Sequence, residues 1–245
     1  MLGRVGQRVR FSTAQNTQCH IKTKLRSLLR ETAQPVAVVT SLLRQDSSNL
    51  TTFHGATLSS FSSIAMDPYP LVAFSLRIPS RMATSLRTSS NTNTKPPYAS
   101  PSAPSDMVVN ILSAAQASTA VLFSRPDLHP NPFKEIKYSL NDEGIPVLEG
   151  SLGALSCKLA APPTMLDDLA FAGVDIEESR SEPNSISPSS GFTSELFIAR
   201  VTKVEMLALD MDNVEPDDAH AMPLLYHRRG YSTCSESLDL GDEKI

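Results

Sequence analysis

Short apolar runs, rich in β-branched residues and bounded by polar or Pro-containing turns, recur along the chain and constrain its fold most strongly. They lie at residues 35–43, 51–57, 71–77, 107–112, 147–160, 195–209 and 223–226. Such runs are typical of strands. One segment reads as a core helix: Ser113 and Gln116 form a capping-box pattern, and Pro126 ends it. About six strands and one core helix exclude a βαβ rhythm, so we predict a mainly β, antiparallel barrel with a few peripheral helices.

Composition and charge exclude two classes of partner. No window approaches the roughly 18 apolar residues of a membrane helix, so we expect no membrane-spanning segment. Residues 1–30 hold seven Lys and Arg and no acidic residue; the rest has 15 basic residues (22 less seven) against 26 acidic, a net charge of −11. A body that acidic, in a chain without Trp and with 6% aromatic residues, does not suit nucleic-acid binding.

The N-terminal segment is basic, acid-free and scattered with Ser and Thr. This composition is typical of a mitochondrial transit peptide, and it lacks the apolar core of a secretory signal. The alternative is a disordered basic tail on a cytoplasmic protein. We take residues 1–27 as this segment; Leu25, Leu28 and Leu29 share a helical face that belongs either to it or to the first helix of the fold.

Gly55 to Pro70 is unusually rich in hydroxyl groups. Ser59, Ser60, Ser62 and Ser63 follow Thr57 where a buried strand would carry Val, Ile or Leu, and Asp67-Pro68 predicts a turn. Small hydroxyl-bearing residues allow a ligand to approach the backbone and offer it hydrogen-bond donors. The segment is therefore either a ligand-binding strand or a Ser-rich loop.

Other motif searches are negative. There is no Rossmann or P-loop glycine pattern and no G-x-S-x-G. The five histidines, His54 among them, lack the i, i+3 or i, i+4 spacing of a metal site and read as surface or polar-core residues, so no metal is expected. The three cysteines form no framework, and Cys157 reads as a core residue.

Two segments interrupt the strand pattern. Residues 88–106 and 165–191 are rich in Ser and Pro, and the second is also acidic, which is typical of surface insertions. A polar tail covers residues 232–245. We therefore predict one domain at 28–231 that contains both insertions.

Five segments occur in an order that resembles the flavin reductase-like family, whose fold is an FMN-binding split barrel. They are VAVVT at 36–40, HGATLSSFSS at 54–63, DPYPLVAFSL at 67–76, VNILSAAQ at 109–116 and PVLEGSLGALSC at 146–157. The resemblance covers about 28–160 and 193–231. It implies a split, Greek-key-like barrel, and the basic N-terminus suggests a fungal/mitochondrial-type member.

The resemblance also implies a cofactor site. The serine-rich stretch would then bind a flavin, FMN with FAD left open, along the ring and ribityl chain. The residues expected there are Ala56, Thr57, Leu58, Ser59, Ser60 and Ser63. Ser80, Arg81 and Thr84 correspond to the place where the family holds the phosphate, although Arg81 also reads as a solvated surface arginine.

The late strand and the closing motif add candidates near the ring or the nicotinamide. Where family reductases carry a histidine, this chain has Glu195. Tyr226, Arg228 and Tyr231 match a closing Y-x-R-x-x-Y pattern, and His227 is a candidate substitute for the missing histidine. No acid–base triad is expected, because stacking and orientation suffice for hydride transfer.

Three functions follow from the resemblance. The first is an NAD(P)H-dependent FMN reductase that acts as a homodimer, with a flavin-dependent monooxygenase as a candidate partner. The second is a flavin carrier or electron-transfer protein without reductase turnover, suggested by Glu195. The third is a split-barrel interaction module that has lost its flavin.

Overall fold

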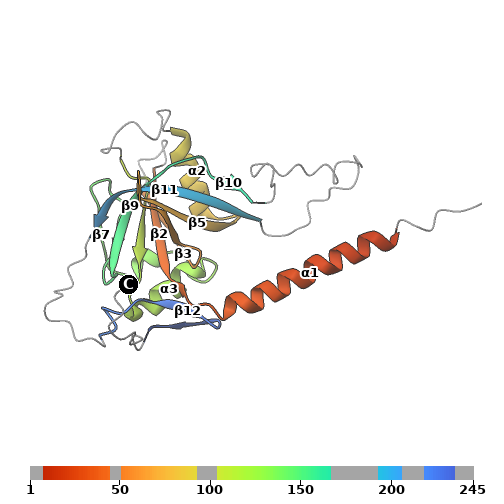
Figure 1. The fold of residues 1–245 in the computed structure, drawn as a ribbon. Helices are drawn as coiled ribbons and strands as arrows, with labels where there is room; N and C mark the ends of the chain where they lie inside the picture. The colour runs from red at the N-terminus through yellow and green to blue at the C-terminus, as the bar shows by residue number, and fades with distance from the viewer. Residues whose placement is uncertain (1–7, 45–50, 93–103, 167–192, 206–217, 235–245) are drawn as a thin grey trace, which may run out of the picture.

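A computed structural model describes residues 8–44, 51–92, 104–166, 193–205 and 218–234 (Figure 1). The helices are α1 (Arg8–Arg30), α2 (Arg81–Thr92) and α3 (Ala117–Ser124), with short 3-10 helices η1 (Ala114–Gln116) and η2 (Pro132–Lys134). The first strands are β1 (Gln34–Pro35), β2 (Ala37–Arg44), β3 (Thr51–Leu58), β4 (Ser62–Ala65), β5 (Leu71–Ile78) and β6 (Met107–Ile111). The remaining strands are β7 (Tyr138–Leu140), β8 (Pro146–Leu148), β9 (Gly153–Leu159), β10 (Thr164–Met165), β11 (Thr193–Glu205), β12 (Leu225–His227) and β13 (Gly230–Ser232).

The main sheet is antiparallel and does not close on itself. Its strand order is β3-β2-β6-β9-β11-β5-β4, with β10 paired to β11. β3 and β4 therefore lie at opposite ends of the sheet, although only residues 59–61 separate them in sequence. The sheet curls enough for β3 to contact β5. This open half-barrel confirms the predicted mainly β, split-barrel class.

Helix α2 covers the interior of the half-barrel. Along β5 the side chains of Val72, Phe74 and Leu76 alternate inward, and Phe74 stacks on Phe197 of β11 with ring centroids 5.3 Å apart. α2 completes this core with apolar side chains that are 2% exposed or less, those of Met82, Ala83 and Leu86. Burying this apolar surface is the main force that holds α2 against the sheet.

A second core lies on the other face of β2 and β3, under α3. Val36, Val38 and Leu112 pack there with Phe123 of α3. Gly55 allows this close approach, because a Cβ at that position would lie 2.5 Å from Cε1 of Phe123. α2 and α3 thus pack on opposite faces of the β2–β3 pair.

The structure contradicts a buried strand for the serine-rich stretch and supports the alternative, a Ser-rich loop, over residues 59–61. The chain leaves β3 after Leu58, and Ser59, Ser60, Ser62 and Ser63 are all exposed. The stretch is a crossing between the two ends of the sheet followed by the short edge strand β4. An end strand needs fewer apolar side chains, because fewer layers cover it.

Other predictions hold in part. The predicted strands are present, but β7, β10 and β13 were missed, and one core helix was too few. The helix after Ser113 begins as η1 and continues as α3, with the predicted bond from Ser113 N to Gln116 Oε1 (3.2 Å). The insertion at 88–106 was placed too early, because α2 extends to Thr92. Residues 93–103, 167–192 and 235–245 lie outside the described part of the chain.

Helix α1 stands apart from the barrel in Figure 1. Its described apolar side chains are 46–65% exposed, those of Ile21, Leu25, Leu28 and Leu29. The chain contacts the rest of the fold directly after α1. Arg228 binds Glu31 through Nε and Nη2 (2.8 and 2.7 Å), and β1 pairs with β12. No helix in the described residues has the length and apolar character needed to cross a membrane.

Asn110 of β6 links three segments of the core and provides a stability test. It is fully buried; its Nδ2 donates to Val38 O (3.1 Å), and its Oδ1 accepts from Leu148 N (2.8 Å). We expect Asn110→Ala to lower the free energy of unfolding by about 2–3 kcal/mol, because two buried backbone groups lose their partner. Urea denaturation measures the change.

The exposed Asn131 is the control for this variant. Asn131→Ala should change the free energy of unfolding by less than about 0.5 kcal/mol. Equal effects of the two substitutions would contradict a structural role for the Asn110 contacts.

Candidate functional site

Strand β3 lies between the two helices, and its side chains alternate between them. On the α3 side, Thr57 Oγ1 donates to Ala120 O (2.7 Å) and Gly55 meets Phe123. On the α2 side, Ala56 and Leu58 pack into the core that contains Met82. The side chains of Thr57 and Leu58 are therefore used in packing, and the backbone of β3 is what remains to meet a ligand.

That backbone has a free hydrogen-bonding edge. In the described part of the chain, β3 ends the sheet and has β2 as its one strand neighbour. The outward-pointing N–H and C=O groups of such an edge can pair with an extended peptide or with the polar edge of a heterocycle. A site at this edge is thus flanked by α2 and α3.

Helix α2 contacts β3, and its beginning supplies hydroxyl groups and one cation. Ser80 caps the helix: its Oγ accepts from Ala83 N (3.3 Å), and its carbonyl accepts from Thr84 N and Thr84 Oγ1 (3.1 Å each). Arg81 is exposed in the first turn. The Thr84 hydroxyl proton is donated to the Ser80 carbonyl, whereas Ser80 Oγ only accepts. A helix N-terminus with an arginine and the Ser80 hydroxyl has donors that suit an anionic group such as phosphate.

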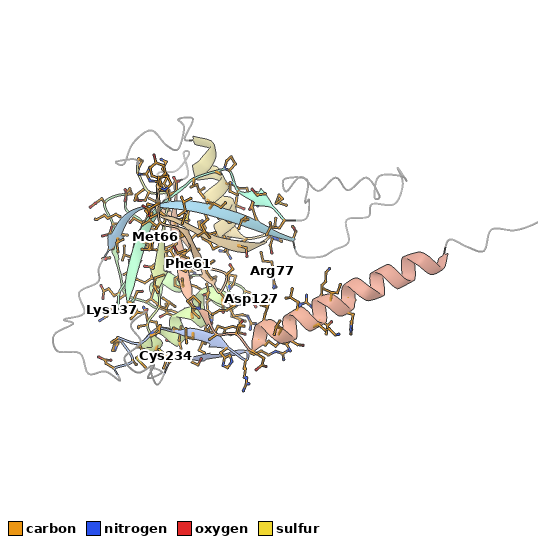
Figure 2. All side chains as sticks on the ribbon, in the orientation of Figure 1. Phe61, Met66, Arg77, Asp127, Lys137 and Cys234 are labelled. Atoms are coloured by element: carbon orange, nitrogen blue, oxygen red, sulfur yellow. The ribbon has the colours of Figure 1, made fainter. Side chains whose placement is uncertain are left out.

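The serines after β3 differ in what their hydroxyls do. Ser60 Oγ is held by both backbone groups of Ser75, accepting from N at 2.9 Å and donating to O at 3.2 Å. This pair ties the crossing segment to β5. Ser59 and Ser63 are exposed, and Ser63 pairs with Val72 in the β4–β5 ladder. Figure 2 labels Phe61 and Met66 close together on the curled sheet.

His54 belongs to this region, although sequence reasoning did not include it. It lies opposite Ser41 of β2, and Ser41 Oγ bonds Ser85 Oγ (2.9 Å) and Met82 Sδ (3.3 Å) of α2. Cross-strand neighbours share a face, so His54 also faces α2. Burial and, secondarily, the positive charge of Arg81 lower the pKa of His54 below its usual 6.5. Only the strand register could have revealed this placement.

Glu195 faces the same core from β11. Its side chain is 3% exposed, and its Oε2 accepts a hydrogen bond from Arg87 Nε of α2 at 3.0 Å. In the β11–β5 ladder Glu195 lies opposite Leu76, two residues before the end of β5. The carboxylate therefore lies under α2 and carries a charged partner.

The closing hairpin forms a separate group. Tyr226 and Tyr231 meet edge to face with centroids 5.6 Å apart, and Tyr231 packs into the core under α3. Burial mainly, and the Tyr226 hydroxyl after it, raise the pKa of Tyr231. His227 is half-buried in β12, and the turn that follows has positive φ at Arg228 (49°). These residues lie in a different sheet from Glu195, and within one chain the structure does not bring the two groups together.

The remaining candidate groups are the Cys157 thiol and the side chains that could bind a metal ion. Cys157 is fully buried, as predicted, and burial raises the pKa of its thiol to about 12. Among the described residues, no cluster of three or more His, Cys, Asp or Glu could hold a metal ion.

The chain belongs to the flavin reductase-like family, since the family's "Flavin reductase like domain" model matches residues 29–235. It is similar to the FMN reductase (NADH) SmoA of Agrobacterium fabrum, with 26% identity over 137 residues that cover 56% of this chain and 68% of that protein. The family named from the five ordered segments is thereby confirmed.

Solved structures share the fold. Nitrilotriacetate monooxygenase component B from Mycobacterium thermoresistibile matches with a TM-score of 0.59 and 19% identity, over 92% of this chain and 96% of that one. The NADH:FAD oxidoreductase SgcE6 of Streptomyces globisporus matches with a TM-score of 0.56 and 17% identity, over 90% and 91%. At these identities the likeness shows the fold alone.

The placement of His54 predicts a pH dependence. Its pKa is lower in the folded protein than in the unfolded chain, so the unfolded chain binds a proton more readily below about pH 6.5. This effect is absent above that pH and destabilises the fold as pH falls toward the folded-state pKa. We expect the free energy of unfolding to fall more steeply between about pH 7.5 and about pH 5 in the wild type than in His54→Gln.

The matched control replaces an exposed histidine. His220→Gln should keep the wild-type slope of unfolding free energy against pH. If His54→Gln also keeps that slope, His54 is not in the environment described.

Proposed function

We propose that this protein is an NAD(P)H-dependent flavin reductase that binds FMN at the free edge of β3 and the beginning of α2. The observation that carries the proposal is that α2 contacts β3, whose outer edge has no strand partner among the described residues, in a chain of the flavin reductase-like family. The relative SmoA is named as an NADH-dependent FMN reductase. The flavin, when bound, supplies the acceptor for the hydride of the reduced nicotinamide.

The donor set at the beginning of α2 fits a phosphate ester. Ser80 Oγ accepts from Ala83 N and keeps its own proton for a ligand, and Arg81 brings a positive charge. The helix dipole adds positive potential at the same place. We assign Ser80, Arg81 and Thr84 to the phosphate.

The edge of β3 fits the polar side of a flat ring. Backbone groups from Ala56 onward and the exposed hydroxyl of Ser59 are the donors and acceptors that remain once Thr57 and Leu58 are packed. The protein's task is to orient the two rings and to limit water between them. FMN is the proposed cofactor, because the relative SmoA is named as an FMN reductase.

The proposed electron donor is NADH or NADPH. The residue at the position where the family carries a histidine near the nicotinamide is Glu195. Its carboxylate accepts a hydrogen bond from Arg87. This pairing favours one second candidate, a flavin carrier or electron-transfer protein without NAD(P)H turnover. The first candidate is preferred because hydride transfer requires orientation and no proton from Glu195.

We also propose that the active form is a homodimer and that it supplies reduced flavin to a flavin-dependent monooxygenase. The exposed Ile64 and Met66, at 49% and 71%, lie next to the serine segment and support an interface there. Within one chain, the hairpin with Tyr226, His227, Arg228 and Tyr231 is remote from α2. In a dimer, the hairpin of one copy would approach the flavin bound by the other copy. Reductase components named in two-component systems share this fold, BorF among them.

The purified protein tests the function. We expect it to bind FMN stoichiometrically and to bleach the bound flavin when NADH or NADPH is added without oxygen, as followed by visible absorbance. Light scattering of the same sample should give twice the chain mass. FMN binding without bleaching by either nucleotide would favour the carrier, and no FMN binding would exclude both.

A substitution at Ser59 tests the location of the site. Ser59→Leu should weaken FMN binding by about tenfold or more, because a bulky side chain stands at the β3 edge, while the melting temperature stays unchanged. Ser60 is less suitable, since it anchors Ser75. The control is Ser139→Leu on the exposed face of β7. Unchanged FMN affinity in Ser59→Leu would refute this placement.

We further propose that the protein is a fungal/mitochondrial-type member directed to the mitochondrial matrix by residues 1–27, with the cytoplasm as the alternative. The charge of the segment and the separation of α1 from the barrel support the proposal. Loss of residues 1–27 would leave Glu31 in place for its contact with Arg228.

A fusion of residues 1–35 to a fluorescent protein tests the targeting. We expect it to colocalise with a matrix marker, because basic, acid-free helices are imported along the membrane potential. A variant with Arg26 and Arg30 replaced by Glu should remain in the cytosol. Diffuse fluorescence of the unaltered fusion would exclude the targeting role.

A further inference from the structure

The ion pair between Arg87 and Glu195 links helix α2 to the sheet through a nearly buried carboxylate. Nε of Arg87 lies 3.0 Å from Oε2 of Glu195, and the two side chains are 43% and 3% exposed. A carboxylate with so little access to water depends on its charged partner. Removing Arg87 would therefore leave the Glu195 carboxylate without this charged partner, and removing Glu195 would leave Arg87 without it.

The carboxylate side of the pair is fixed by the sheet. β11 pairs with β5 continuously from Thr193 opposite Ile78 to Arg200 opposite Leu71, and Glu195 lies near one end of this ladder. The neighbouring inward side chain on β11, that of Phe197, is stacked on Phe74. Glu195 is thus fixed on a strand that is hydrogen-bonded to β5. β5 ends at Ile78, two residues before Ser80.

The arginine side belongs to the helix face that carries the proposed phosphate donors. Ser80, Thr84 and Arg87 are spaced four and three residues apart, which places them along one side of α2. The opposite side, with Met82, Ala83 and Leu86, packs into the core. Apolar packing is non-directional and limits rotation of a helix weakly, whereas a hydrogen-bonded ion pair has a defined direction.

We infer that Arg87 and Glu195 form a positioning pair that fixes the rotation of α2 and so aligns Ser80, Arg81 and Thr84 for the phosphate of the cofactor. The inference rests on the proposed function. Glu195 then has a role different from the histidine that the family carries at this place: its carboxylate binds Arg87 and does not handle the nicotinamide.

Phosphate-dependent binding distinguishes this role from a general contribution to folding. FMN and riboflavin share the ring and ribityl chain and differ in the phosphate. We expect Arg87→Met and Glu195→Gln each to raise the Kd for FMN about tenfold and to change the Kd for riboflavin less than about twofold, measured by quenching of flavin fluorescence. Arg87→Lys, which keeps the charge, should recover most of the FMN affinity.

The double variant and a surface control complete the test. Arg87→Met/Glu195→Gln should bind FMN no more weakly than Arg87→Met alone, because the two residues act as one unit. It also leaves no unpaired charge in the core, so it remains usable if a single variant fails to fold. The control is Arg125→Met, which removes the exposed Arg125–Asp127 pair and should leave both affinities unchanged.

The possible results distinguish the positioning role of Arg87 and Glu195 from the proposed flavin-binding function. A parallel loss of FMN and riboflavin affinity, or unchanged FMN affinity in a folded Arg87→Met protein, would overturn the positioning role and leave the flavin site intact. A wild-type protein that binds neither flavin would overturn the proposed function and the inference together.

Discussion

The open edge of the main sheet is the constraint on which the other features depend. Because β3 and β4 end the sheet, the core between them must be covered by something other than a strand, and α2 does this with Met82, Ala83 and Leu86. The same arrangement leaves the outer backbone edge of β3, the one that faces away from β2, without a strand neighbour in the described chain. Incomplete closure thus provides both the edge and the helix of the candidate site.

The position of β3 between two helices decides which groups can meet a ligand. Its alternating side chains are used in the two cores, Thr57 toward α3 and Leu58 toward α2. Binding at this place therefore relies on backbone groups, on Ser59 after the strand and on the first turn of α2. This explains why a site for a polar heterocycle needs no acidic or basic cluster in the sequence.

The sequence predicted most strands correctly, because period-two apolar patterns such as Val72, Phe74 and Leu76 record which face is buried. It failed where the decisive contacts are long-range. Nothing local shows that the chain passes from one end of the curled sheet to the other between Leu58 and Ser62. The weak helix formers of 88–92 concealed the end of α2. The Arg87–Glu195 contact joins residues 108 positions apart, and the position of His54 against α2 depends on its register with Ser41.

The carboxylate of Glu195 connects fold and turnover. In the sequence it stands where a histidine is expected, which argues against reductase chemistry. In the structure it is 3% exposed and bonded to Arg87, so its charge is already compensated before any nucleotide arrives. A compensated, buried carboxylate repels a nicotinamide phosphate less than a free one would. Hydride transfer depends on ring alignment, and a pair that fixes α2 contributes to that alignment through the cofactor, so Glu195 is compatible with turnover.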